Sequence, residues 1–242
     1  MQIVHGLTVW FSVSLSVASG ATLVGVNFGA SGATSPTNWT LITTPGILNN
    51  LIDTNGAPTT ISIAVSSTPA LPDMFSEAPV ASTIPSNAPT LAKLHSNFSS
   101  YNGTPTNHLL AQFSGLTPNG VYSVYAIGLR YSGGINQSVT ITGSGAPVMF
   151  SQIGPVDSLF FNGSIGSSSQ TLESYAQPIQ ASSSGTIAID FTSGPQRYTV
   201  AGVALSFTPA MSATPVPSSM VLVLIGLAAG GLFYLLRPVS QA

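Results

Sequence analysis

The sequence predicts an all-β fold, an antiparallel β-sandwich, on the strength of two observations. Apolar and polar residues alternate over several short segments, and turn-forming residues separate these segments. The alternating segments are residues 60–65, 122–127, 139–142 and 186–191, with a longer final run at 198–207. Alternation with a period of two directs one strand face to a core and the other to solvent. Many short strands with this punctuation are typical of a sandwich.

Glycine, proline and asparagine mark the expected turns. The strongest signals are Asn55-Gly56 and the segments 118–120 and 143–145. Short helices are expected only at residues 46–52 and 89–98. The proline-rich segment 66–89 is expected to form a long surface loop.

The composition of the chain excludes several classes of protein. Its 242 residues include four Lys and Arg, six Asp and Glu and no cysteine. A protein that binds a phosphate backbone needs many basic side chains, so nucleic acid is not expected as a partner. The lack of cysteine removes disulfides and thiolate metal ligands. A polar surface built from Ser, Thr, Asn and Gln favours an exported β-protein.

The C-terminal residues predict a membrane segment. Residues 220–236 form an uncharged apolar run that Arg237 follows directly. As a helix the run spans about 25 Å, close to the thickness of the hydrocarbon core of a bilayer. Because basic residues favour the cytoplasmic side, the tail 237–242 is expected inside and the preceding domain outside. The alternative is a buried core helix.

The N-terminal residues predict a secretory signal peptide over residues 1–20. An apolar stretch at residues 7–17 is followed by small residues at 18–21, which places cleavage after Gly20 or slightly later. The alternative is a first strand of the domain. The expected organisation is therefore a signal peptide, a sandwich domain at 21–209, a Pro/Ser/Thr linker at 210–219, the membrane helix and the short tail.

The C-terminal segment resembles the PEP-CTERM sorting signal of bacterial exosortase substrates. Pro215, Val216 and Pro217 stand at the position of the family's Pro-Glu-Pro motif, ahead of the apolar run, and Arg237 stands at its basic end. Val216 replaces the acidic residue, and a single Arg replaces a basic cluster. The resemblance implies a bacterial envelope protein that an exosortase-like enzyme cuts near the motif. The product is then released or attached to surface polysaccharide.

The domain also resembles the jelly-roll sandwiches that are common among such proteins, including galactose-binding-like modules. The opening strand at residues 26–29, the segment 116–122 that leads into a central strand and the closing strand at 202–205 carry the resemblance. It implies a jelly-roll fold with carbohydrate binding by analogy. Fold does not determine function, so a structural or adhesive role in the cell envelope or matrix is the first expectation.

Catalytic chemistry is not expected. The chain has no nucleophile elbow, no zinc-protease motif and no phosphate-binding glycine loop. His95 and His108 lack metal-ligand spacing, so neither a metal nor a cofactor is expected. The alternative is a secreted hydrolase in which Asp73 and Glu77 act as paired carboxylates.

A carbohydrate site would need an aromatic platform and a few polar groups, and five residues offer them. The candidates are Trp39, Asn38, Asp53, Tyr101 and Asn102. The alternative for Trp39 is a place in the core of the sandwich, and the alternative for Tyr101 is loop packing. The segment 53–56 has the oxygen ligands of a calcium site but equally the sequence of a plain turn.

The N-glycosylation sequons allow a second interpretation of where the protein comes from. Five of them occur in the sequence, beginning at Asn38, Asn97, Asn102, Asn136 and Asn162. In a eukaryote they would indicate a glycosylated ectodomain. The alternative to a bacterial envelope protein is therefore a eukaryotic surface protein with a single membrane span.

Overall fold

The computed structural model describes residues 22–29, 33–68, 79–94, 108–129, 137–153, 157–193 and 200–207. The chain divides into two units, Met1–Phe207 and Thr208–Ala242. The predicted signal peptide, linker, membrane helix and tail all lie outside the described residues. Among the residues that are described, no helix is long and apolar enough to cross a bilayer.

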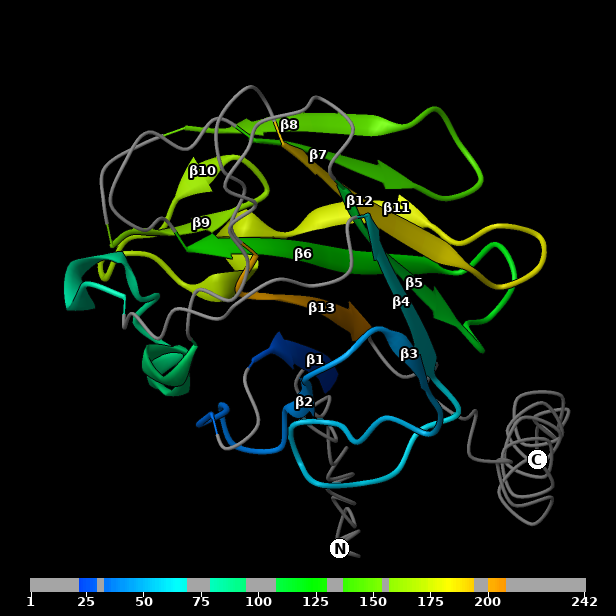
Figure 1. The fold of residues 1–242 in the computed structure, drawn as a ribbon, viewed down its shortest axis with the longest axis horizontal. Coiled ribbons are helices and arrows are strands. Elements are labelled where there is room, and N and C mark those ends of the chain that lie inside the picture. Colours follow the sequence, from blue (N-terminus) through cyan, green and yellow to red (C-terminus); the bar gives the residue numbers. More distant parts are fainter. Residues whose placement is uncertain are drawn as a thin grey trace, which may run out of the picture. The chain divides into compact units, whose positions relative to one another are not determined.

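Two β-sheets make up the domain, and the prediction of an all-β sandwich is confirmed (Figure 1). Sheet A has the order β10-β9-β6-β13-β1-β2, and β11 pairs with β6 beside β9. Its strands are β1 (Thr22–Phe28), β2 (Thr40–Ile42), β6 (Val121–Leu129), β9 (Leu159–Phe161), β10 (Ser164–Ile165), β11 (Gln177–Gln180) and β13 (Gly202–Phe207).

Sheet B has the order β3-β4-β5-β12-β7-β8. Its strands are β3 (Gly46–Leu48), β4 (Ser62–Thr68), β5 (His108–Ser114), β7 (Gln137–Thr142), β8 (Val148–Gln152) and β12 (Ile187–Ser193). Every pairing in sheet B is antiparallel, whereas sheet A contains one parallel pair, β1 with β2.

The alternating segments of the sequence correspond to β4, β6, β7 and β12, and the final run contains β13. The helix expected at residues 46–52 is wrong, because Gly46–Leu48 forms β3 at the edge of sheet B. All three residues of β3 are exposed, so this strand has no alternating pattern. The helix expected at 89–98 is present in part, as the short 3-10 helix η2 (Pro89–Lys93).

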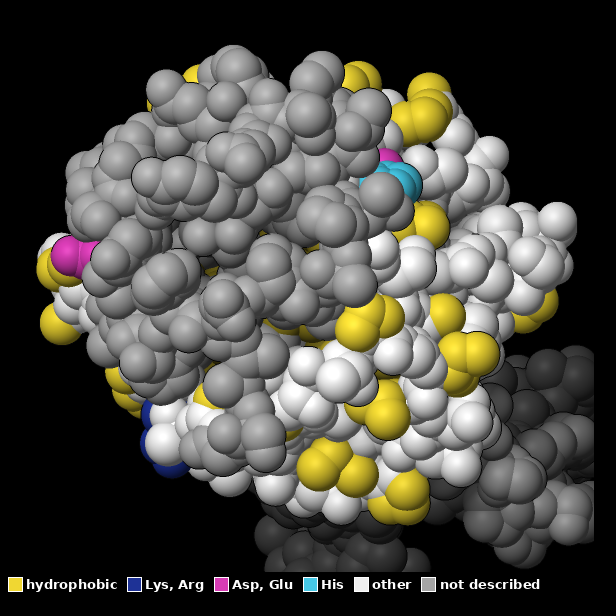
Figure 2. Space-filling model, viewed as in Figure 1, with side chains coloured by type: hydrophobic (Ala, Val, Ile, Leu, Met, Phe, Trp, Pro, Cys, Tyr) yellow, Lys and Arg dark blue, Asp and Glu magenta, His cyan; other side chains and the backbone are white. Residues whose placement is uncertain are grey.

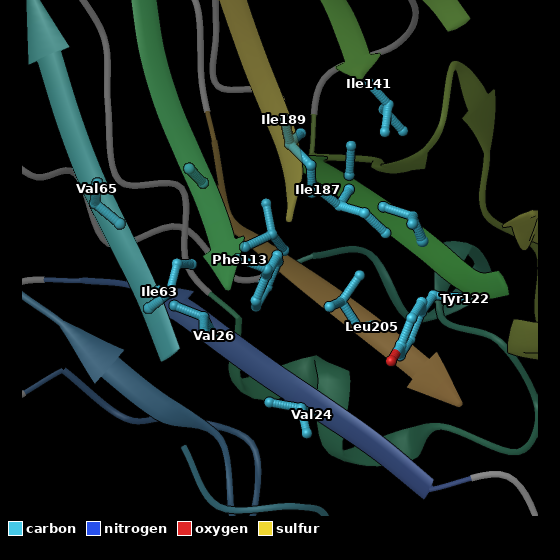
Figure 3. Packing of buried hydrophobic residues seen from close by; sticks show 14 of the residues in the cluster. Val24, Val26, Ile63, Val65, Phe113, Tyr122, Ile141, Ile187, Ile189 and Leu205 are labelled. Atoms are coloured by element: carbon cyan, nitrogen blue, oxygen red, sulfur yellow. The ribbon is translucent and has the colours of Figure 1, made fainter. Parts of the chain in front are cut away.

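The main hydrophobic core fills the space between the two sheets. It receives the inward-facing residues of each strand, such as Val24 and Val26 of β1, Ile63 of β4 and Phe113 of β5, all fully buried. Figure 3 shows Val26 and Ile63 reaching toward each other from the two sheets. Burial of these side chains supplies the main driving force for folding, at roughly 25 cal/mol per Å² of apolar surface.

Sheet A has a second apolar layer on its outer face. On β6, Tyr125, Ile127 and Leu129 face outward and are as fully buried as their inward neighbours. Two short 3-10 helices, η2 and η3 (Leu172–Tyr175), contribute residues to this layer, and Ile84, directly after η1 (Ala81–Thr83), packs against it. Figure 1 shows η1 and η2, in teal, beside this sheet. Because both faces of β6 are buried, apolar residues occupy its inward and its outward positions alike.

Asn162 joins the two strands that share one edge of β6. β11 pairs with residues 121–124 of β6, and β9 pairs with residues 127–129. At the junction, the side-chain oxygen of Asn162 accepts a hydrogen bond from the Ala126 N–H (2.8 Å), and its nitrogen donates to the carbonyls of Val124 (2.6 Å) and Tyr175 (2.9 Å). The Asn162 amide thereby forms hydrogen bonds with backbone groups of β6 at the junction between β11 and β9.

This geometry also bears on the sequon at Asn162. The side chain is 7% exposed, and both donors of its amide are engaged. A glycan requires that nitrogen to be free and on the surface. In the folded domain, Asn162 is therefore not an accessible acceptor.

The surface of the domain carries little charge. Figure 2 shows few acidic or basic side chains, with one histidine beside an acidic group. This pair is His108 Nδ1 and Asp190 Oδ1, 3.5 Å apart on the outer face of sheet B. The rest of that face is formed mainly by Ser, Thr, Gln and Ala side chains of the paired strands.

Candidate functional site

The candidate site is a pocket of about 290 Å³ on the outer face of sheet A. Sheet A contributes Leu23 of β1, Tyr125 of β6 and Ser206 of β13. The walls come from the loop before β2, the turn at residue 54, and the segments around η2 and η3. These wall residues are Thr37, Trp39, Thr54, Asn87, Ala88, Thr90, Leu91, Leu172 and Glu173. The volume lies at the lower end of the range for small-molecule sites.

Trp39 lies flat on the sheet at one side of the pocket. A Cβ added to Gly25 of β1 would overlap the indole atoms Cδ2 and Cε2 and would come within 2.8 Å of Cε3. Overlap with both atoms of the bond shared by the two rings means that Gly25 lies under the face of the indole. Trp39 is only 6% exposed and belongs to the second apolar layer. It is a core residue that also lines the pocket.

Asn38 and Asp53 hold the neighbouring turn in place. The Asn38 side-chain nitrogen donates to the Thr54 carbonyl (2.9 Å), and Asn38 itself has a φ of 60°. Asp53 Oδ1 accepts the N–H groups of Asn55 (2.9 Å) and Ala57 (2.8 Å). Neither side chain lines the pocket, so both act by positioning Thr54, which does. Of the predicted site residues, these two and Trp39 come together.

The remaining sequence-predicted residues cannot be placed in the same way. Tyr101, Asn102, Asp73, Glu77 and His95 lie outside the described residues. Asp53 uses one carboxylate oxygen within its own turn, which is the geometry of the plain-turn alternative. In the described ranges no group of three or more His, Cys, Asp or Glu side chains could hold a metal ion.

Among the predicted site residues that the structure describes, Trp39 is the only one that lines the pocket; Tyr125, Asn87 and Glu173 line the pocket but were not predicted. Asn87 precedes η2, and its side-chain nitrogen donates to Glu173 Oε2 of η3 (2.8 Å). Its side-chain oxygen accepts the N–H of Leu172 (2.8 Å). Asn87 thereby joins two segments that are 86 residues apart in the chain. The two sides of the pocket are held together by this amide.

The pocket carries one negative charge. Burial alone would raise the pKa of Glu173, but hydrogen bonds from its own backbone N–H, from Thr171 and from Asn87 outweigh burial and hold that pKa below its ordinary value. Glu173 is therefore ionised at neutral pH. Burial, and secondarily the Glu173 charge, raises the pKa of Tyr125 to about 12, so this phenol stays protonated.

Replacing Asn87 with Ala is expected to raise the pKa of Glu173, because the carboxylate loses a donor that stabilises its charged form. The measurement is a ¹³C NMR titration of the full chain with labelled glutamate. Only Glu77 and Glu173 then give side-chain carboxyl signals, and a Glu77→Gln variant assigns them. An unchanged Glu173 titration in Asn87→Ala would contradict the assigned role of the amide.

The described residues define a β-sandwich domain with an aromatic pocket on sheet A in which Glu173 is the only charged lining residue. A second pocket of about 200 Å³ lies along residues 41–48, and no titratable side chain lines it. No protein-family model matches the chain. No curated protein matches it either.

Proposed function

We propose that this protein is an exported component of the cell envelope or extracellular matrix, of structural or adhesive type and without enzymatic activity. The observation that carries the proposal is the C-terminal arrangement of Pro215-Val216-Pro217, the apolar run 220–236 and Arg237. Its partners are the membrane through residues 220–236, an exosortase-like processing enzyme and surface polysaccharide. A sandwich surface with little charge supports a place outside the cytoplasm.

We infer a jelly-roll connection for the sandwich. In a jelly roll a long antiparallel hairpin folds over on itself, so that its strand pairs are nested along the chain. Nested pairs of this kind support the inference: β1 with β13, β5 with β12, β6 with β11, and β7 with β8. Lectin domains use this architecture, which is an analogy and not a demonstration of activity.

Intact-mass analysis of the protein from its native host tests the proposed sorting. We expect a species that begins near Ala21 and ends between residues 215 and 219, in the surface fraction or the medium. A Pro215→Ala, Pro217→Ala double variant should keep residues 220–242 and stay with the membrane. If the unmodified protein keeps these residues in the membrane fraction, it is a stable single-span protein and the sorting proposal is wrong.

A second candidate function, carbohydrate binding, is favoured by the pocket. It combines two aromatic side chains, Trp39 and Tyr125, with the polar groups of Asn87, Glu173 and several threonines. Aromatic surface with a few placed polar groups is the usual composition of a small-molecule site. The residues that hold Trp39 and Glu173 in place also give the pocket a formed shape before any ligand arrives.

A glycan array probed with the full chain tests this second function. Thr90 is exposed at the rim of the pocket, so Thr90→Gln should narrow the pocket and reduce binding to any glycan that the array identifies. Thr142→Gln makes the same change on sheet B, away from the pocket, and should leave binding intact. Equal binding by the two variants would place the glycan site elsewhere.

A further inference from the structure

The charge of Glu173 has no cationic partner within the described part of the chain. There the only ion pair is His108 with Asp190, on the other sheet. Lys93, at the end of η2, is the one Lys or Arg among the described residues, and it makes no ion pair with Glu173. An ionised carboxylate at the wall of a pocket attracts a ligand of opposite charge.

Two aromatic rings lie in the same pocket as this carboxylate. One face of the Trp39 indole lies on Gly25 of β1, and Tyr125 stands on β6, which β13 separates from β1 in sheet A; both side chains line the pocket. The face of an aromatic ring attracts cations, and indole does so most strongly. A carboxylate beside Trp and Tyr therefore favours an organic ammonium group over a neutral one.

The other polar groups of the pocket suit hydroxyl groups on the ligand. Tyr125 lines the pocket and is 2% exposed, and its protonated hydroxyl can donate a hydrogen bond. Such a buried donor gains from a ligand that accepts its hydrogen bond. Thr37, Thr54, Thr90 and Ser206 add hydroxyl groups around the same space, which is large enough for one small ring and little more.

We propose that this pocket binds an organic ammonium group carried on a hydroxylated ring, the chemistry of an unacetylated amino-sugar unit. Glu173 is the counter-ion of the ammonium group, Trp39 and Tyr125 contact the ring, and the threonine and serine hydroxyls bind its hydroxyl groups. The inference rests on the carbohydrate-binding function proposed above and names its ligand.

The test compares two disaccharides that differ only at C2 of each ring: β-1,4-linked glucosamine and β-1,4-linked glucose. Both are titrated into the full chain with Trp10→Phe, so that Trp39 is the only indole reporter. Isothermal titration calorimetry gives a second readout. We expect the glucosamine disaccharide to bind about tenfold more tightly, the size of one partly exposed ion pair with a cation–π contact.

The variants separate this inference from the function on which it rests. Glu173→Gln should abolish the difference between the two disaccharides, while Asp190→Asn, which removes the same charge from sheet B, should preserve it. Equal binding of the two by the unmodified pocket would overturn the ammonium inference and leave carbohydrate binding standing. Failure of both to bind, together with a negative glycan array, would overturn the inference and the carbohydrate function alike.

Discussion

Asn162→Asp is expected to lower the free energy of unfolding by about 3–5 kcal/mol, although it hardly changes the size of the side chain. The amide nitrogen donates to the carbonyls of Val124 and Tyr175, and a carboxylate has no hydrogen to donate. Two buried acceptors would lose their donor, and a negative charge would face them. Urea unfolding of the full chain, followed by circular dichroism, measures the loss.

The matched control is Asn119→Asp. Asn119 also has a left-handed backbone, with a φ of 59° against 48° at Asn162, but it is exposed. This control should change stability by less than about 0.5 kcal/mol, as surface substitutions usually do. If both variants lose the same stability, the effect lies in the backbone conformation and not in the hydrogen bonds.

The pH dependence of Asn162→Asp gives an independent check. Burial beside carbonyl oxygens raises the folded-state pKa of the introduced carboxyl group above its unfolded value of about 3.9. The loss of stability that its charge causes is therefore absent at pH values below the unfolded-state pKa and grows as the pH rises toward the folded-state pKa. We expect the difference in stability from the unmodified protein to be smaller at pH 3 than at pH 7.

Gly25→Ala is the second substitution for which we expect a large effect, a decrease of about 2–3 kcal/mol in the free energy of unfolding. The added methyl group would overlap the face of Trp39, which is packed and only 6% exposed. The indole must move, and with it one wall of the pocket. In a chain with Trp10→Phe, the emission of Trp39 should shift toward that of a more solvated indole, and the urea midpoint should fall.

Gly145→Ala provides the control, because a Cβ at that position meets no atom within 4 Å. It should leave both readouts unchanged. A double-mutant cycle with Trp39→Leu adds a sharper test. If the clash is the cause, Gly25→Ala should cost much less stability when Trp39 is already replaced, whereas additive losses would contradict the proposed packing.

The sandwich was predictable because most of its strands have one buried and one exposed face. β7 and β12 show this alternation in the sequence, and the inward positions are the buried ones. β3 was misread because an edge strand with three exposed residues has no such pattern. The sequence of β6 could have predicted more. Its apolar residues occupy both alternating sets of positions, which indicates burial on both faces and hence the second apolar layer.

The pocket was predictable only in part. Trp39 stands out in a sequence with two tryptophans, and the turn at Asp53 is recognisable from its residues. Glu173 and Asn87, however, belong to segments far apart in the chain, and neither lies in a local motif. Their meeting depends on how η2 and η3 pack on sheet A, which no short-range pattern encodes.

The pairing of β1 with β13 sets an order for folding. Thr22, the first described residue, stands opposite Phe207, the last, so β1 finds its main partner only when the far end of the domain is available. At the usual rate of synthesis, that strand emerges roughly 10–35 s after β1. Until then sheet A lacks β13, which lies between β6 and β1, so this sheet cannot be completed. This order would serve the proposed export, because a domain that completes sheet A only with its last strand stays open to passage through a membrane pore until that strand is made.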